Sequence, residues 1–381
     1  MCSSYKEASS NLCEAMANVA RRICTTTVPS NSLGALLACR LVPLNKNPGV
    51  RPIGVGEVAR RIICKAIMIV VKKDVMVSAG PLQLCTGIPS GCKVAVRAMA
   101  ELFEEPESQG VLLVDAENAF NSLNRKVVLH NIVYVCPALA TVLNNCYQTP
   151  SRLIVPGGGE LLSKEGITQG DPLGMAMFAL SIVPLILKLS ETGESLSQVW
   201  FADDASGAGS LQGLRQWWDA LSTLGLSFGY YPKPSKPCLV IHPQNEEAAK
   251  AVFGEAGITI TTEGQPHLGS ALGSVSFKEE YVTHKVDEWR VEVEKLAEMA
   301  GSQPQAAYAA FVHGTRNKWT MCVEQYLTAA ISCNPWRMQY NRSLSLLSPE
   351  DLHAHITRGH SWPFQQGWGI RLGRSHFHSR P

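Results

Sequence analysis

Two adjacent aspartates are the residues of this chain whose types and spacing first suggest chemistry. Asp203 and Asp204 follow the β-prone run Val199–Ala202, and small residues continue the chain to Gly209. This pattern predicts a tight β-hairpin with the carboxylates at its tip. Side-by-side carboxylates repel each other, so they are not expected to ionise together in a site without a cation. Taken alone, the pair also fits an exposed acidic turn.

A third carboxylate favours a site over an exposed turn. Val111–Val114 is a short apolar run that predicts a strand, and Asp115 follows it directly. Between Asp115 and the pair lies Gln169–Gly174, a loop with the sequence QGDPLG that precedes a long apolar helix. Carboxylates suit Mg²⁺ because they supply part of its octahedron and phosphate oxygens complete it. These residues therefore indicate metal-dependent chemistry on phosphates.

The order of these segments resembles that of a known enzyme family. The strand ending at Asp115, the QGDP loop and the hairpin Phe201–Asp204 resemble motifs A, B and C of reverse transcriptases. The resemblance is strongest to polymerases of non-LTR retrotransposons and runs from about Leu41 to Ser274. It implies an RNA-directed DNA polymerase, which is a nucleotidyltransferase. It also implies an α+β right-hand fold with fingers, an antiparallel palm sheet with helices, and a partial helical thumb.

The resemblance and the residue pattern together predict four segments. Residues 1–40 are expected to form an N-terminal helical extension, and residues 41–274 the fingers and palm. Residues 275–333 are expected to form the partial helical thumb. Residues 334–381 form a basic, histidine-rich tail in which periodicity fades, and we expect this tail to be poorly ordered.

The resemblance assigns the catalytic roles to four residues. Asp115, Asp203 and, less directly, Asp204 would hold two Mg²⁺ ions, with Mn²⁺ as a possible substitute. Lys236 lies in a segment that resembles motif D and would donate a proton to the leaving pyrophosphate.

A second hairpin supplies candidate contacts to the incoming nucleotide. Residues 41–55 read as two strands joined around Pro48-Gly49, which favours a type II turn. In the family this hairpin brings a lysine and an arginine onto the triphosphate, and Lys46 and Arg51 match that pattern. Arg60 or Arg61 is a second choice. The alternative is a solvated turn with two ordinary cations.

Three further residues are implied to contact the substrates. Phe120 falls on the aromatic position that contacts the sugar of the incoming nucleotide, although a buried core phenylalanine would look the same. Gln169 and Gly170 would let the backbone approach the template base and the nucleotide. Asp171 is expected to cap the helix that follows rather than bind metal. Pro184 is expected to kink or break that helix.

Composition limits the environment of the protein. Formal net charge is +2, but residues 1–73 contain 11 Lys or Arg against 3 Asp or Glu, which suits a polymer of phosphates. Twelve cysteines without a CxxC pair favour a reducing, intracellular compartment and leave nucleus and cytoplasm open. The strongly apolar, uncharged run at residues 172–187 is too short for a membrane span.

The expected partners are an RNA template, a DNA primer and deoxynucleoside triphosphates, with no membrane. Two alternatives remain open. The first is a catalytically inactive retroelement remnant that still binds nucleic acid. The second is an RNA-dependent RNA polymerase, which usually carries glycine where this chain has Ala202.

Overall fold

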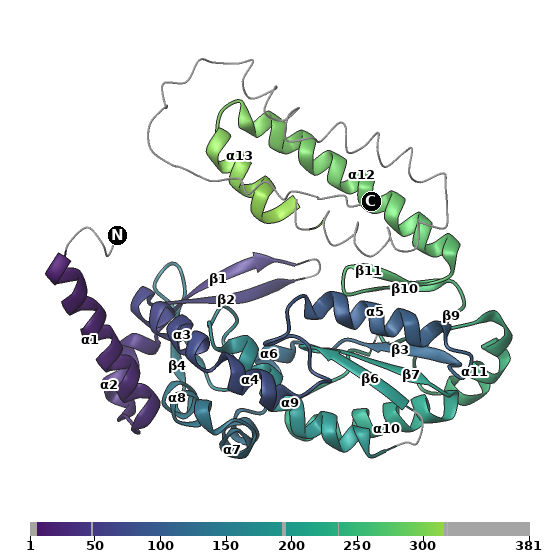
Figure 1. The fold of residues 1–381 in the computed structure, drawn as a ribbon, viewed down its shortest axis with the longest axis horizontal. Coiled ribbons are helices and arrows are strands. Elements are labelled where there is room, and N and C mark those ends of the chain that lie inside the picture. Colours follow the sequence, from purple (N-terminus) through teal and green to yellow (C-terminus); the bar gives the residue numbers. More distant parts are fainter. Residues whose placement is uncertain (1–5, 47–48, 193–195, 235, 316–317, 319–381) are drawn as a thin grey trace, which may run out of the picture. The chain divides into compact units, whose positions relative to one another are not determined.

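The computed structural model describes residues 6–46, 49–192, 196–234, 236–315 and 318. The chain forms two compact units, residues 1–286 and 287–381, which are described separately below. The fold is of the mixed α+β class, as predicted (Figure 1). The predicted tail, residues 334–381, lies outside the described residues.

The first unit contains helices and three sheets. Its helices are α1 (Lys6–Thr25), α2 (Ser30–Leu37), α3 (Val58–Val70), α4 (Lys72–Ala79), α5 (Gly91–Glu104), α6 (Ala119–Ser122), α7 (Arg125–Val135), α8 (Pro137–Tyr147), α9 (Gly174–Ser190), α10 (Leu211–Phe228), the 3-10 turn η2 (Pro243–Asn245) and α11 (Glu246–Phe253). Its strands are β1 (Cys39–Asn45), β2 (Val50–Gly56), β3 (Gly110–Val114), β4 (Ser151–Ile154), β5 (Glu160–Ser163), β6 (Leu196–Phe201), β7 (Asp204–Gly209), β8 (Cys238–Ile241), β9 (Thr259–Thr261), β10 (Gly264–His267) and β11 (Ser270–Gly273).

A five-stranded sheet with the order β6-β7-β3-β8-β9 lies at the centre of this unit. Strands β6, β7, β3 and β8 are antiparallel to one another, as predicted. The outermost pair differs from the prediction, because β9 lies parallel to β8. The chain reaches β9 through α11, and a helical crossover of this kind is the usual way to join parallel strands.

Every residue of the central strand β3 is buried, because helices cover both faces of the sheet (Figure 1). Val111 and Leu113 pack on one side with Met99 and Phe103 of α5. Leu112 and Val114 face the other side, where the core includes Leu214, Trp217 and Leu221 of α10. Side chains alternate along a strand, so this two-sided burial also fixes which way the residues just beyond β3 point.

A second sheet has the order β2-β1-β4-β5. The predicted hairpin at residues 41–55 is β1–β2, slightly longer at its open end, with Leu44 opposite Arg51. Strand β4 pairs parallel with β1 and antiparallel with β5. A third, two-stranded sheet consists of β10 and β11.

The start of helix α9 differs from the expectation, and Pro184 does not break the helix. The helix begins at Gly174 with Leu173 at the N-cap position, whereas Asp171 was expected there. One carboxylate oxygen of Asp171 does accept the backbone N–H of Leu173, at 3.0 Å, but the other contacts side chains from elsewhere in the fold. Pro184 lies inside a single continuous helix and does not end it.

Helix α12 (Val275–Ala300) crosses the boundary between the two units. In the second unit it is followed by α13 (Pro304–Ala310) and the π-helical turn η3 (Phe311–Thr315). The predicted thumb and the bounds of the four predicted segments stay predictions. Among the described residues, we find no helix that combines the length and apolar character needed to span a membrane.

Candidate active site

Strand register brings three of the predicted catalytic residues together. Val114 of β3 is opposite Ala205 of β7, so the next pair along these strands is Asp115 with Asp204. On the other side of β3, the register with β8 brings Lys236 beside Asp115. The Lys236 ammonium donates to Asp115 Oδ2 at 2.6 Å, and this lysine is half exposed. The predicted lysine therefore contacts the first catalytic aspartate directly.

The predicted acidic hairpin is β6–β7, with Ala202 and Asp203 as its two-residue loop. Ala202 has a φ of 55°, in the left-handed region that non-glycine residues rarely occupy. A positive φ at the first loop position alone is the pattern of a type II′ hairpin turn. The loop therefore places Asp203 at the tip, and Asp204 becomes the first residue of β7.

Burial and neighbouring negative charges disfavour the ionised form of Asp204. Burial raises the pKa of this carboxyl to about 7, with further contributions from the negative charges of Asp203 and Asp115. The ammonium of Lys236 acts in the opposite direction. The three aspartates therefore lie close enough to oppose one another's ionisation.

The cations of the β1–β2 hairpin act on the same group of carboxylates. Burial raises the pKa of Asp203, and Asp115 adds to this shift. The positive charges of Arg51 and Lys46 lower it. Both cationic residues are exposed. The structure thus brings the predicted triphosphate-binding pair within electrostatic range of Asp203, although their contact with a nucleotide stays a prediction.

The donor set fits a divalent cation that arrives with phosphate. Carboxylates that raise one another's pKa are stabilised by a cation between them. Within the described ranges, no three His, Cys, Asp or Glu side chains are already arranged around one metal position. Mg²⁺ usually binds to one or two carboxylates and completes its shell with substrate phosphates and water. The site has the ligands for that kind of binding.

Phe120 lies at the edge of the core beside the loop that precedes α9. Its ring stacks on Phe178 of α9, with centroids 4.7 Å apart and an interplanar angle of 23°. Its carbonyl accepts the backbone N–H of Ile167 at 2.5 Å. Phe120 is partly buried, so it is a packing residue, and its predicted contact with the nucleotide sugar stays a prediction.

Gln169 and Gly170 dock against the β1–β2 hairpin. Gly54 of β2 donates its N–H to the Gln169 carbonyl at 2.7 Å. Gly170 has a φ of +102°, and a Cβ there would lie 2.8 Å from the Gly54 carbonyl oxygen. A Cβ at Gly54 would lie 2.2 Å from the Thr168 side chain. Close backbone approach and a positive φ therefore favour glycine at position 170, whereas at position 54 the Thr168 side chain occupies the space of a Cβ.

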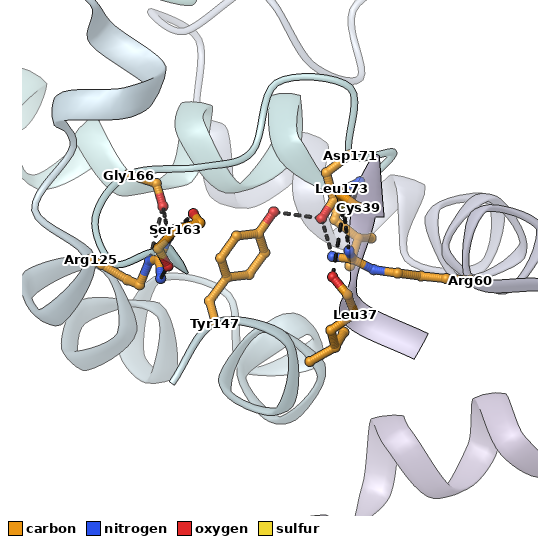
Figure 2. Close-up of polar contacts among 9 residues, drawn as sticks. All are labelled: Leu37, Cys39, Arg60, Arg125, Tyr147, Ser163, Gly166, Asp171 and Leu173. Carbon is orange, nitrogen blue, oxygen red and sulfur yellow. Dashed lines mark hydrogen bonds and ion pairs between the residues drawn. The ribbon is translucent and has the colours of Figure 1, made fainter. Parts of the chain in front are cut away.

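A buried ion pair anchors the loop that contains Gln169 and Gly170 (Figure 2). The guanidinium of Arg60 contacts Asp171, and their side chains are 6% and 1% exposed. Tyr147 donates its hydroxyl to the same carboxylate oxygen. Arg60 is thus a structural residue and is not available as the second-choice triphosphate contact. It shares the buried face of α3 with Ile63.

Arg125 fixes the segment that leads into this loop (Figure 2). Its guanidinium donates to the carbonyls of Ser163, Glu165 and Gly166 at 2.7–3.0 Å. It also lies over the ring of Tyr147, 5.4 Å from the centroid. The sequence interpretation missed this role, because helix-start patterns predict only that Arg125 is the first residue of α7.

Known structures with similarity to this chain include telomerases of two yeasts. Apo telomerase from Candida tropicalis, truncated from its C-terminal domain, is 13% identical with a TM-score of 0.46, covering 64% of this chain and 54% of that one. Telomerase from Candida albicans in complex with a fragment of telomeric RNA is 11% identical with a TM-score of 0.45, covering 93% and 65%. The chain thus spans roughly half to two thirds of these proteins.

No protein-family model matches the chain, and no curated protein matches it. Because both TM-scores lie below 0.5, we base the functional interpretation on the residues of the site itself.

Proposed function

We propose that this protein is an RNA-directed DNA polymerase of the non-LTR retrotransposon kind. One observation carries the proposal: Asp115, Asp203 and Asp204 converge at one end of the five-stranded sheet, within electrostatic range of Lys46 and Arg51. Carboxylates within electrostatic range of cations suit a metal-bound triphosphate. The sheet corresponds to the palm, the β1–β2 hairpin to the fingers and the α12–α13 helices to a partial thumb.

The three aspartates would hold two Mg²⁺ ions, or Mn²⁺ in their place. Bound there, the ions supply Lewis-acid activation of the primer 3′-hydroxyl and of the triphosphate. Lys46 and Arg51 offset the triphosphate charge. Lys236, which pairs with Asp115 at 2.6 Å, would exchange that contact for the leaving pyrophosphate and donate a proton to it.

The remaining residues position the template and the sugar. Gln169 and Gly170 would offer backbone to the template base and the nucleotide. Phe120 excludes a 2′-hydroxyl, which makes DNA the product. The partners are then an RNA template, a DNA primer and deoxynucleoside triphosphates. We propose a reducing intracellular compartment, in agreement with the nine unpaired cysteines that the structure describes.

Primer extension with purified protein tests the proposal. Wild type is compared on RNA and DNA templates with deoxy- or ribonucleotide pools, and we expect extension on RNA with deoxynucleotides and Mg²⁺. Asp203→Asn should abolish extension. Asp219→Asn, which changes an exposed aspartate of α10 paired with Arg215, is the matched control and should extend normally.

Each alternative gives a different result in this assay. An inactive remnant would bind primer–template without extending it under any condition. An RNA-dependent RNA polymerase would use the ribonucleotide pool. Either result would overturn the proposed function.

A further inference from the structure

Two buried side chains from other segments hold the backbone of the acidic turn. Gln83 is fully buried, and its amide contacts Ala202 twice. Gln83 Oε1 accepts the Ala202 N–H at 2.9 Å, and Gln83 Nε2 donates to the Ala202 carbonyl at 3.2 Å. Tyr230, also buried, donates its hydroxyl to the Asp203 carbonyl at 2.8 Å. Both loop residues of the hairpin are therefore bound by side chains outside the hairpin.

The amide of Gln83 is itself fixed in place. Its segment runs parallel to the end of β6, because Leu84 donates its N–H to the Trp200 carbonyl and Trp200 donates its own to Leu82, each at 2.8 Å. The Cys85 N–H reaches Gln83 Oε1 at 3.4 Å. A buried amide with both ends bonded has no alternative partner in water, so its orientation is set.

The ring of Tyr230 is fixed by packing. It meets Trp200 edge-on, with centroids 5.4 Å apart, and Trp200 is fully buried. A Cβ at Gly225 would lie 2.7 Å from the Tyr230 carbonyl, so helix α10 approaches this residue closely. The Tyr230 hydroxyl therefore contacts the turn from a ring whose position is fixed by packing.

The turn needs such support because its conformation is unfavourable. Ala202 has a positive φ, which costs free energy for a residue with a Cβ and persists only where the surroundings over-determine it. If the side-chain bonds were absent, the loop would gain access to other turn geometries. Asp203 would then lose its fixed position relative to Asp115.

We propose that Gln83 and Tyr230 are positioning residues that hold the Ala202–Asp203 turn in the geometry in which Asp203 and Asp204 work together. The kinetic consequence rests on the proposed polymerase function, whereas the structural consequence does not. Residues that orient metal-binding side chains without touching the metal typically contribute about 10–100-fold to metal affinity or activity. We call the contacts of Gln83 and Tyr230 with the Ala202–Asp203 turn the clamp, and we expect its contribution to be of this size.

The kinetic test uses the nearly isosteric Gln83→Met, together with Tyr230→Phe. Asn145→Leu is the matched control, because Asn145 of α8 is also a buried amide with both ends bonded, but it contacts Ile23, Thr26 and Val28 rather than the turn. We expect kcat to fall about 10–100-fold in Gln83→Met. The apparent Mg²⁺ activation constant should rise, while primer–template affinity stays within about twofold. The control should lose stability without this pattern.

A second measurement keeps the inference testable without any activity. Hydrogen exchange is followed in the peptide that covers residues 199–206, and Mn²⁺ binding to the protein is followed by electron paramagnetic resonance. In Gln83→Met, the peptide should exchange faster and Mn²⁺ should bind about 10-fold more weakly, whereas Asn145→Leu should leave both unchanged. Equal behaviour of the two variants would overturn the clamp. If wild type extends no primer, the proposed function fails, and these two readouts still decide the clamp.

Discussion

Lys236 and Asp115 form an ion pair of 2.6 Å across the edge between β3 and the segment before β8. This pair would compete directly with the proposed divalent cation for the carboxylate, because one oxygen of Asp115 accepts a hydrogen bond from the ammonium. The lysine side chain is 50% exposed, so the pair is only moderately strong. A nucleotide that draws Lys236 away would therefore free a metal ligand.

This competition predicts opposite effects on binding and turnover. Lys236→Met should tighten Mn²⁺ binding without nucleotide by a few-fold, since an exposed pair contributes up to about 1 kcal/mol. It should also slow primer extension, because the proton donor is lost. Titration calorimetry and single-turnover kinetics measure the two effects, with Lys250→Met on α11 as the control. Weaker Mn²⁺ binding by the variant would argue against the competition.

The carboxylate of Asp115 should be indispensable for chemistry but not for nucleic-acid binding. Asp115→Asn keeps the side-chain shape and removes one negative charge. We expect extension to fall by about 100-fold or more, since metal activation supplies several kcal/mol. Primer–template affinity should stay equal or become tighter, because repulsion of phosphates decreases. Near-normal extension by this variant would remove Asp115 from the metal site.

The β1–β2 hairpin should contribute to use of the nucleotide. Lys46→Ala or Arg51→Ala should raise the KM for nucleotide or lower kcat, about 10-fold or more, because a bond to a charged group contributes about 1.5–3 kcal/mol. Steady-state kinetics with varied nucleotide give the values. Arg152→Ala, an exposed arginine of strand β4, is the control. If only template affinity changes, the two cations contact the nucleic-acid backbone instead.

Phe120 should determine which nucleotide sugar is accepted. Phe120→Ala removes a ring that would exclude a 2′-hydroxyl by steric overlap, so ribonucleotide use should increase about 10-fold or more relative to deoxynucleotide use. The ratio of incorporation efficiencies measures this. Because the ring also stacks on Phe178, some loss of stability is expected, and Phe120→Leu provides a milder variant. An unchanged ratio in both variants would make Phe120 a core residue only.

His267 should make stability depend on pH. Burial lowers the pKa of this imidazole to about 4, and its Nε2 has no hydrogen-bond partner among the described residues. The unfolded chain, with a pKa near 6.5, then binds more protons between these values. The contribution of neutral His267 to the free energy of unfolding is therefore fully present above about pH 6.5. It falls by up to about 3 kcal/mol toward pH 4.

Denaturant titrations between pH 4 and 7 measure this effect. His267→Phe, which removes the titrating group and keeps an aromatic ring, should flatten the curve over this range. A slope that persists in the variant would assign the acid sensitivity to other groups.

Local sequence patterns predict the hairpins and some helix ends of this fold. The β1–β2 and β6–β7 hairpins follow from turn residues between apolar runs, and Asn124, a residue type that favours helix N-caps, caps α7 by accepting the Val127 N–H. Helix α10 continues past Gly225 to Phe228, and close packing against Tyr230 explains the internal glycine.

The missed features depend on contacts between distant segments. Gln83 and Ala202 are separated by 119 residues, and Gln83 lies in a loop whose composition carries no signal for a buried amide. Arg60 looks like a surface cation on α3 until Asp171 is placed beside it, 111 residues away. Asp171 was expected to cap a helix for the same reason, because its buried partner is invisible to a local pattern.

The backbone contact between Gly54 and Gln169 has a mechanical consequence. No side chain fits between the two segments at Gly54 or Gly170, and a hydrogen bond of 2.7 Å joins them. The β1–β2 hairpin therefore cannot move at Gly54 without also moving the loop that precedes α9. A displacement of the hairpin tip would be transmitted to this loop through the hydrogen bond at Gly54.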